Sequence, residues 1–284
     1  MHRRGPTNEA GSGFRRAGRA LAVAGLCLSL WSCSLFEDEQ PQYVELPVET
    51  LYNNAMNAMQ AGALGEAARL FDEVERQHPY SSWAAKAQLM AAYSNYQANR
   101  YDEAINALER FIQLHPGNKD IAYAYYLRAV SYYEQISDVS RDQRATKQSL
   151  AALEEVVRRF PESSYARDAA LKIDLARDHL AGKHMGIGRY YLEQGEYLAA
   201  INRFQLVIRD YQTTTHVPEA LHRLVESYLA LGVTDEAQST AAVLGHNYPG
   251  SAWYADSYVL LTGIDLRPQE QSDSWISRMW NSII

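Results

Sequence analysis

The residues that could do chemistry are few, and most of them are scattered along the chain. No HExxH, GxSxG or P-loop motif occurs, and the GIG stretch at 186–188 lacks the third glycine and the preceding strand of a dinucleotide site. The histidines do not cluster. His78 and His115 each precede a proline at the end of a predicted helix, where an imidazole interacts favourably with the negative end of the helix dipole. These patterns predict a protein that is not an enzyme and holds no metal or cofactor. Cys33 is the one reactive residue whose sequence neighbours indicate a chemical role, because it stands just after an apolar segment near the amino terminus.

Cys33 ends a segment with the features of a secretory signal. Five arginines precede an apolar run at 20–30, and this run is too short to cross a bilayer. The sequence LWSC at 30–33 resembles a lipobox, in which the chain is cut before the cysteine and its thiol is acylated. The residue after the cysteine is Ser34 and not aspartate, which in bacterial lipoproteins implies that the acylated protein is released to the outer membrane. We expect residues 1–32 to be a lipoprotein signal peptide and Cys33 to carry lipid, which leaves no disulfide partner in the mature chain.

Two other interpretations of the amino-terminal segment stay open. Cys33 could be an incidental thiol at the end of a membrane-directing segment. The Arg15–Arg16 pair alone is a weak twin-arginine signal. Residues 33–46 are acidic and contain Pro41, so we expect a flexible tether between the acylated cysteine and the folded domain.

A recurring apolar pattern organises the rest of the chain. In its clearest copy a small residue, Ala104, is followed by Leu108 and Phe111 on one helix face and by Pro116, which cannot continue a helix. The offsets of four, seven and twelve recur from Ala67 and from Ala237. They recur with one substitution each from Ser149 and from Ala200. The anchors are 37, 45, 51 and 37 residues apart, near the roughly 34-residue tetratricopeptide period.

This pattern predicts an all-α fold, an α-solenoid of about five tetratricopeptide-like helical hairpins over residues 47–263. The hairpins are expected at about 47–80, 81–117, 118–162, 163–213 and 214–250, with a capping helix at 251–263. A polar insert from Ser137 to Arg144 lengthens the third hairpin. The absence of proline from 163 to 194 predicts one long helix in the fourth.

Residues 264–284 form a separate tail of linker and amphipathic helix. Its apolar residues share one helix face and are candidates for docking: Trp275, Ile276, Met279 and Trp280. Such a helix could bind a partner helix or the membrane interface, or fold back to seal the last repeat. The sequence favours neither interpretation.

The charge of the chain bears on its partners. Residues 1–32 hold five of the 27 basic residues and one of the 34 acidic ones, so the remaining 22 and 33 give a net charge of −11. Because phosphate binding needs a basic face, we expect no nucleic-acid partner.

Four stretches carry the resemblance to a known family: RQHPYSSWAAKAQL, RFIQLHPGNKDIAYAYYLRAVSYY, FPESSYARDAALKIDLARDHLA and GRYYLEQGEYLAAINRFQLVIRDYQ. With the lipobox and the repeats, the likeness covers about residues 33–263. The chain resembles the BamD family (ComL/YfiO-like), tetratricopeptide-repeat lipoproteins of the bacterial β-barrel assembly machinery. The resemblance implies a non-catalytic scaffold that is lipid-anchored on the periplasmic face of the outer membrane.

The same resemblance implies partners and site residues. The partners are the barrel-assembly outer-membrane protein, docked through its POTRA domain, the accessory lipoproteins of the complex, and unfolded outer-membrane protein clients. In the family an arginine in the second helix of the fourth unit contacts the POTRA domain, and the AAINR motif places it at Arg203. The groove of the first two units is where the family is thought to hold targeting peptides. The candidates for its lining are aromatic: Tyr80, Trp83, Tyr93, Tyr96, Tyr123 and Tyr126.

Two functions of other classes remain as alternatives. A periplasmic repeat protein that coordinates cell-wall synthesis or division would co-purify with peptidoglycan enzymes. A cofactor-free enzyme would need a compact polar pocket with perturbed titrating groups, which the sequence does not indicate.

Overall fold

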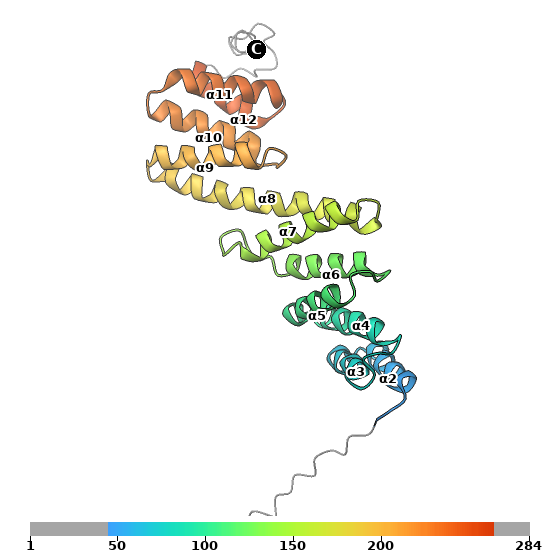
Figure 1. The fold of residues 1–284 in the computed structure, drawn as a ribbon. Helices are drawn as coiled ribbons and strands as arrows, with labels where there is room; N and C mark the ends of the chain where they lie inside the picture. Colours follow the sequence, from blue (N-terminus) through green and yellow to red (C-terminus); the bar gives the residue numbers. More distant parts are fainter. Residues whose placement is uncertain (1–44, 264–284) are drawn as a thin grey trace, which may run out of the picture. The chain divides into compact units, whose positions relative to one another are not determined.

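The computed structural model describes residues 45–263 (Figure 1). The chain divides into two units, Met1–Leu46 and Pro47–Ile284, and the described helices belong to the second. The described part contains eleven α-helices and no strand, which confirms the predicted all-α class. The helices are α2 (Val48–Gln60), α3 (Leu64–Gln77), α4 (Ala84–Gln97), α5 (Tyr101–Leu114), α6 (Ile121–Tyr133), α7 (Arg144–Arg159), α8 (Ser164–Glu193), α9 (Tyr197–Asp210), α10 (Val217–Ala230), α11 (Thr234–Asn247) and α12 (Ala252–Thr262). None of these helices combines the length and the apolar character that crossing a bilayer requires.

Consecutive helices lie side by side in Figure 1, so five helical hairpins follow one another: α2–α3, α4–α5, α6–α7, α8–α9 and α10–α11. The first helices of successive hairpins are also in contact: α4 with α6, α6 with α8, and α8 with α10. The last described helix, α12, packs on α10 and α11. Each hairpin therefore buries its apolar surface against its neighbours in the row, which is how repeat proteins build a core.

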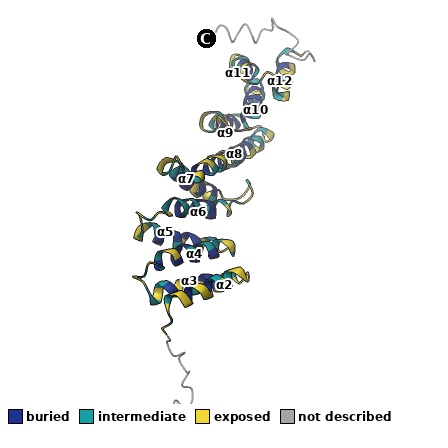
Figure 2. Ribbon diagram, turned by 90° about the vertical axis from the view of Figure 1, so that its right-hand side faces the viewer, coloured by how far each residue is buried: buried dark blue, intermediate teal, exposed yellow. Residues whose placement is uncertain are grey.

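The repeated offsets of the sequence are the positions that the hairpins bury. In α5 the exposed fractions of Ala104, Leu108 and Phe111 are 0, 0 and 1%. In Figure 2 the buried residues lie mainly on the sides of the helices that face neighbouring helices. The equivalent residues of the other hairpins are buried as well: Ala67, Phe71 and Val74; Ser149, Leu153 and Val156; Ala200, Phe204 and Val207; Ala237, Ala241 and Leu244. A small residue at the anchor takes up little of the tightly packed space between the two helices of a hairpin.

The second helix of each hairpin ends in one recurrent way. In α5 the backbone N–H of His115 donates to the carbonyl of Phe111 at 2.8 Å, and Pro116 then has no N–H with which to continue the helix. The fourth hairpin has Gln212 where the others have proline, yet the N–H of Tyr211 still donates to the carbonyl of Val207 at 2.9 Å. Proline thus reinforces this helix end but is not needed for it.

The fourth hairpin contains the predicted long helix, since α8 continues for 30 residues. The Ser163 hydroxyl caps it by accepting a hydrogen bond from the N–H of Ala166 at 3.1 Å. α8 contacts α7 and also α9. A Cβ atom at Gly188 would lie 2.4 Å from Cε1 of Phe204, so glycine is what permits the close packing of α8 against α9.

The polar insert of the third hairpin forms the loop between α6 and α7. We call residues 137–143 the insert loop. Its carbonyl groups bind to α8: the Ser137 carbonyl lies 2.7 Å from His179 Nε2, and the Ser140 carbonyl accepts a hydrogen bond from Lys183 Nζ at 2.7 Å. Arg144, predicted to close the insert, is instead the first residue of α7, because an exposed arginine fits a first helical turn as well as a loop.

Candidate functional site

The first helices of three successive hairpins bring five tyrosines together. Their rings are half-buried, with their bodies against the core, and we call the group the tyrosine surface: Tyr93 and Tyr96 of α4, Tyr123 and Tyr126 of α6, and Tyr165 of α8. The ring centroids of Tyr123 and Tyr165 are 5.6 Å apart, and those of Tyr126 and Tyr165 are 5.2 Å apart. The direct contacts of α4 with α6 and of α6 with α8 produce this arrangement.

Three hydroxyl groups of this surface, those of Tyr96, Tyr123 and Tyr126, stay protonated because their pKa values are raised. Burial, with the nearby Glu134 carboxylate, raises the pKa of Tyr96 to about 12. Burial also raises the pKa of Tyr123 and of Tyr126. The Tyr126 hydroxyl donates to Asp168 Oδ2 at 2.5 Å, and that same oxygen accepts from Lys172 Nζ at 2.8 Å. The tyrosine surface therefore offers ring faces and neutral hydroxyl groups, which suits binding and not acid–base turnover.

The six predicted groove residues do not form one site. Tyr93, Tyr96, Tyr123 and Tyr126 lie together on the tyrosine surface, and Tyr165 belongs with them although the sequence interpretation omitted it. A usable signal was the aromatic residue near the start of successive first helices, which recurs at Trp83, Tyr123 and Tyr165.

Trp83 and Tyr80 have other surroundings. The Trp83 ring packs on Tyr52 of α2 with centroids 4.8 Å apart, and Lys86 Nζ lies over both rings at 5.9 and 5.2 Å. Trp83 therefore joins the first two hairpins. Tyr80 is fully exposed in the loop between α3 and α4, at 101% of its reference area. An exposed loop position offers a ring for contact but does not orient it.

Arg203 lies on α9, half-buried beside His184 of α8. Burial lowers the pKa of His184, and the positive charges of Arg203, Lys147 and Lys183 lower it further. Within residues 45–263 the Arg203 side chain makes no hydrogen bond or ion pair. The Asp210 carboxylate acts in the opposite direction, so three cations and one anion act on the His184 ring. With no ion pair of its own, the Arg203 guanidinium is suited to a carboxylate from outside.

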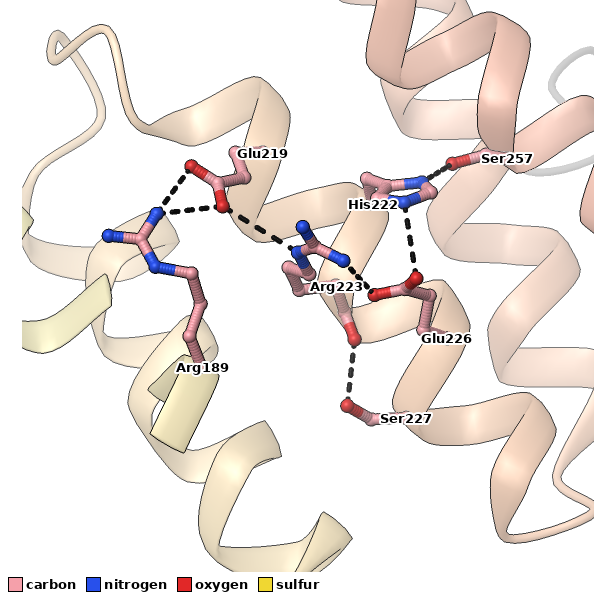
Figure 3. Close-up of polar contacts among 7 residues, drawn as sticks. All are labelled: Arg189, Glu219, His222, Arg223, Glu226, Ser227 and Ser257. Carbon is pink, nitrogen blue, oxygen red and sulfur yellow. Dashed lines mark hydrogen bonds and ion pairs between the residues drawn. The ribbon is translucent and has the colours of Figure 1, made fainter. Parts of the chain in front are cut away.

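A second polar group has the composition of a hydrolase triad. His222 Nδ1 lies 2.8 Å from Ser257 Oγ, and His222 Nε2 lies 3.5 Å from Glu226 Oε1 (Figure 3). His222 is 4% exposed and Ser257 is 0% exposed, and the Trp253 ring lies 5.2 Å from the His222 ring. The serine is thus closed off from solvent by the helices around it. A substrate cannot reach a serine in this position, so the group joins α10 to α12 and does no chemistry.

The same network continues to α8 through charged side chains (Figure 3). Arg189 Nη1 contacts both carboxylate oxygens of Glu219 at 2.8 and 2.9 Å, and Arg223 Nε lies 3.6 Å from Glu219 Oε1. Arg223 Nη1 donates to Glu226 Oε2 at 2.7 Å. Burial opposes the ionisation of Glu226, but the hydrogen bonds from His222 and Arg223 outweigh it and lower the pKa of that carboxyl. Glu219 is thus the carboxylate that joins α8 to α10.

Replacing Glu219 by glutamine is expected to lower the free energy of unfolding by about 1–3 kcal/mol, because Arg189 and Arg223 lose their shared carboxylate. Urea denaturation at neutral pH measures the change. Asp210→Asn is the matched control: its partner Arg209 is 75% exposed, so a loss of no more than about 1 kcal/mol is expected. Equal losses in the two variants would contradict this account of the network.

Several predicted residues lie outside the described range: the acylated Cys33 and the tail candidates Trp275, Ile276, Met279 and Trp280. Between residues 45 and 263 no group of three or more histidine, aspartate or glutamate side chains could hold a metal ion.

Sequence comparisons match residues 44–244 to the family model described as "YfiO: Outer membrane lipoprotein". Relatives named outer membrane protein assembly factor BamD include those of Caulobacter vibrioides and Rickettsia prowazekii. The chain is 54% identical to the first over 80% of its own length and 74% of the relative's. It is 49% identical to the second over 85% of its own length and 95% of the relative's. The BamD of Neisseria meningitidis serogroup A is 34% identical over 82% of this chain and 93% of that protein.

Solved structures similar to the chain are repeat proteins at low identity. The TPR domain of P58(IPK) is 14% identical with a TM-score of 0.40 and covers 83% of this chain and 64% of its own. TTC0263, a TPR protein of Thermus thermophilus, is 19% identical with a TM-score of 0.35, and the match covers 76% of this chain and 98% of TTC0263. The family match spans most of the described hairpins, and the identity holds over four fifths of the chain. The chain belongs to the YfiO family of outer membrane lipoproteins.

Proposed function

We propose that this chain is a non-catalytic outer-membrane lipoprotein scaffold of the β-barrel assembly machinery. It docks the POTRA domain of the barrel subunit and helps to recruit and insert unfolded outer-membrane β-barrel proteins. The observation that supports this most is the 54% identity to a relative named as an outer membrane protein assembly factor. Because the related proteins are assembly factors, the prediction that the chain is not an enzyme is confirmed.

The tyrosine surface is our candidate for the client site. Its ring faces can take apolar and aromatic side chains of an extended segment, and its neutral hydroxyls can bond to backbone groups. Asp168 and Lys172 add one charge of each sign beside Tyr126. Affinity is expected to be modest, since ordering an unfolded client costs several kcal/mol.

Arg203 is our candidate for the contact with the barrel subunit. Its unpaired, half-buried guanidinium on α9 is suited to a carboxylate presented by a folded partner domain. The tyrosine surface lies on α4, α6 and the start of α8, whereas Arg203 lies on α9. Client and barrel subunit would therefore contact different helices and could bind at the same time.

Affinity purification from detergent-solubilised membranes tests the proposal. A barrel protein with POTRA repeats and accessory lipoproteins should co-purify with the tagged full chain. Depletion of the chain should lower porin levels in the outer membrane. Co-purification of peptidoglycan enzymes without a POTRA-bearing barrel protein would instead support the alternative role in cell-wall synthesis or division.

The lipid anchor gives a separate prediction. Cys33→Ala should remove the protein from the outer-membrane fraction, because acyl chains on that thiol would be its attachment to that bilayer. Fractionation followed by immunoblotting measures the distribution. Cys27→Ala is the matched control, since that residue lies in the segment expected to be removed. A Cys33→Ala protein that stayed in the outer-membrane fraction would show that the anchor lies elsewhere.

A further inference from the structure

The insert loop borders two hollows on the surface of α8. Both hollows include Ser140 and Lys183, which are joined by the hydrogen bond from Lys183 Nζ to the Ser140 carbonyl. His179 fixes the start of the loop through its contact with the Ser137 carbonyl at 2.7 Å. The loop therefore has a defined position on α8, and neither the tyrosine surface nor the buried His222 group includes its residues.

The first hollow is apolar and has a volume of about 330 Å³. Its walls include Val139 of the insert loop together with Ile187 and Tyr190 of α8. Gly182 and Gly186 leave its floor without side chains, and a Cβ atom added at Gly186 would meet nothing within 4 Å. The Tyr190 side chain at its edge is 58% exposed. The space is large enough for an aliphatic or aromatic side chain from outside.

The second hollow is cationic and has a volume of about 430 Å³. Its lining includes three cations, Arg141, Lys147 and Lys183, together with the His184 ring, against a single acidic residue, Asp142. This balance is the reverse of that of the chain beyond residue 32, where acidic residues outnumber basic ones by 33 to 22. The excess of positive charge at one place on an acidic protein indicates an anionic partner group.

His184 supplies an independent indication at the same place. Its Nδ1 atom is buried and has no hydrogen-bond partner, which is an uncommon state for a polar atom. The charged groups around it are Arg203 and Asp210 of α9, Lys147 of α7, and Lys183 of α8. Its ring stacks on Tyr211 with centroids 5.9 Å apart, which fixes its orientation. Arg203 does not line the cationic hollow, but its charge acts on His184, which does.

We propose that the two hollows form one docking site for a protein segment that carries a carboxylate side chain beside a large apolar side chain. The carboxylate enters the cationic hollow near Lys147 and His184, and the apolar side chain fills the hollow over Gly186. The proposal rests on the proposed function, because it assigns this segment to the same barrel subunit that contacts Arg203. Arg203 is then one edge of a larger site that α7, α8, α9 and the insert loop build together.

The charged half of the site is tested with Lys147→Glu. Lys147 is exposed on α7 and makes no side-chain bond in the described part of the chain, so its replacement should leave the fold intact. Lys183 is less suitable, because it holds the insert loop. Binding of the full-length chain to the detergent-solubilised barrel subunit should weaken by about tenfold or more, as charge reversal repels a carboxylate. Lys119→Glu makes the same charge change at an exposed position between α5 and α6 and should bind as the wild type does.

The apolar half is tested by filling it from inside. Gly186→Leu places a side chain in the hollow, and the change is favourable for a helix, so the fold should be retained. Binding should weaken by about tenfold or more because the partner's side chain is excluded. Gly186→Ala adds one methyl group, leaves most of the space, and should bind as the wild type does. Circular dichroism and thermal denaturation verify the fold of all four variants.

The outcomes separate this inference from the function on which it rests. If the wild-type chain does not bind a POTRA-bearing barrel subunit, the proposed function is overturned and this inference with it. If Arg203→Glu weakens binding while Lys147→Glu and Gly186→Leu bind as the wild type does, the proposed function stands and the two-hollow site is wrong. Loss of binding in both test variants, with both controls unaffected, supports the site.

Discussion

Replacing Arg203 by glutamate is expected to weaken binding of the barrel subunit by about tenfold or more. The guanidinium is half-buried and unpaired within the described part of the chain, so a partner carboxylate would be its first ion pair. Glutamate would repel that group and would also be attracted to the cations around His184. Titration of the purified full-length variant against the detergent-solubilised barrel subunit measures the loss.

The control for this variant is Arg167→Glu, which reverses an exposed arginine near the start of α8. It should bind the barrel subunit as the wild type does. The pKa of His184 provides a second readout, because removing the positive charge of Arg203 should raise it. A raised His184 pKa with undiminished binding would confirm the local electrostatics and exclude Arg203 from the docking contact.

Phe111→Ala is expected to lower the free energy of unfolding by about 3–5 kcal/mol, the usual cost of removing a large buried aromatic side chain. Phe111 is 1% exposed and belongs to a cluster that joins α4, α5 and α6, with Leu89, Leu108 and Leu127 among its members. Its ring also lies 5.2 Å from that of His115 at the end of α5. The cavity left by the missing Phe111 ring would thus lie between the second and third hairpins.

The loss should be local, because a repeat protein is stabilised hairpin by hairpin. Amide hydrogen exchange should become faster in α4, α5 and α6 and stay unchanged in α10 and α11. Leu114→Ala on the same helix is the control: Leu114 is 59% exposed, so its removal should change stability by no more than about 0.5 kcal/mol. Uniformly faster exchange along the chain would contradict the hairpin-by-hairpin account.

The repeat pattern predicted the fold because it depends on residues that are close in sequence. Offsets of four and seven from Ala104 define one helix face, and that face is buried in every hairpin. The long helix α8 followed in the same way from a proline-free stretch, and the family followed from contiguous motifs. Local spacing is sufficient here since each hairpin packs mainly on its neighbours.

The candidate sites were only partly predictable. Four of the six aromatic residues meet on the tyrosine surface, whereas Tyr80 is fully exposed and Trp83 packs on Tyr52. The same tyrosine spacing on a helix serves core packing and surface contact alike, so sequence could not separate these cases. The roles of Cys33, Arg203 and the tail stay predictions.

By itself the sequence determined the helical hairpins, their order and the family, because helix period, small anchors and proline stops are local properties. Only the tertiary structure decided which side chains meet across hairpins. Tyr165 reaches Tyr126, Ser257 reaches His222, and the insert loop reaches α8, over separations of about 35 to 43 residues. These meetings depend on how one helix packs on the next, and the offsets within a single helix carry no information about that packing.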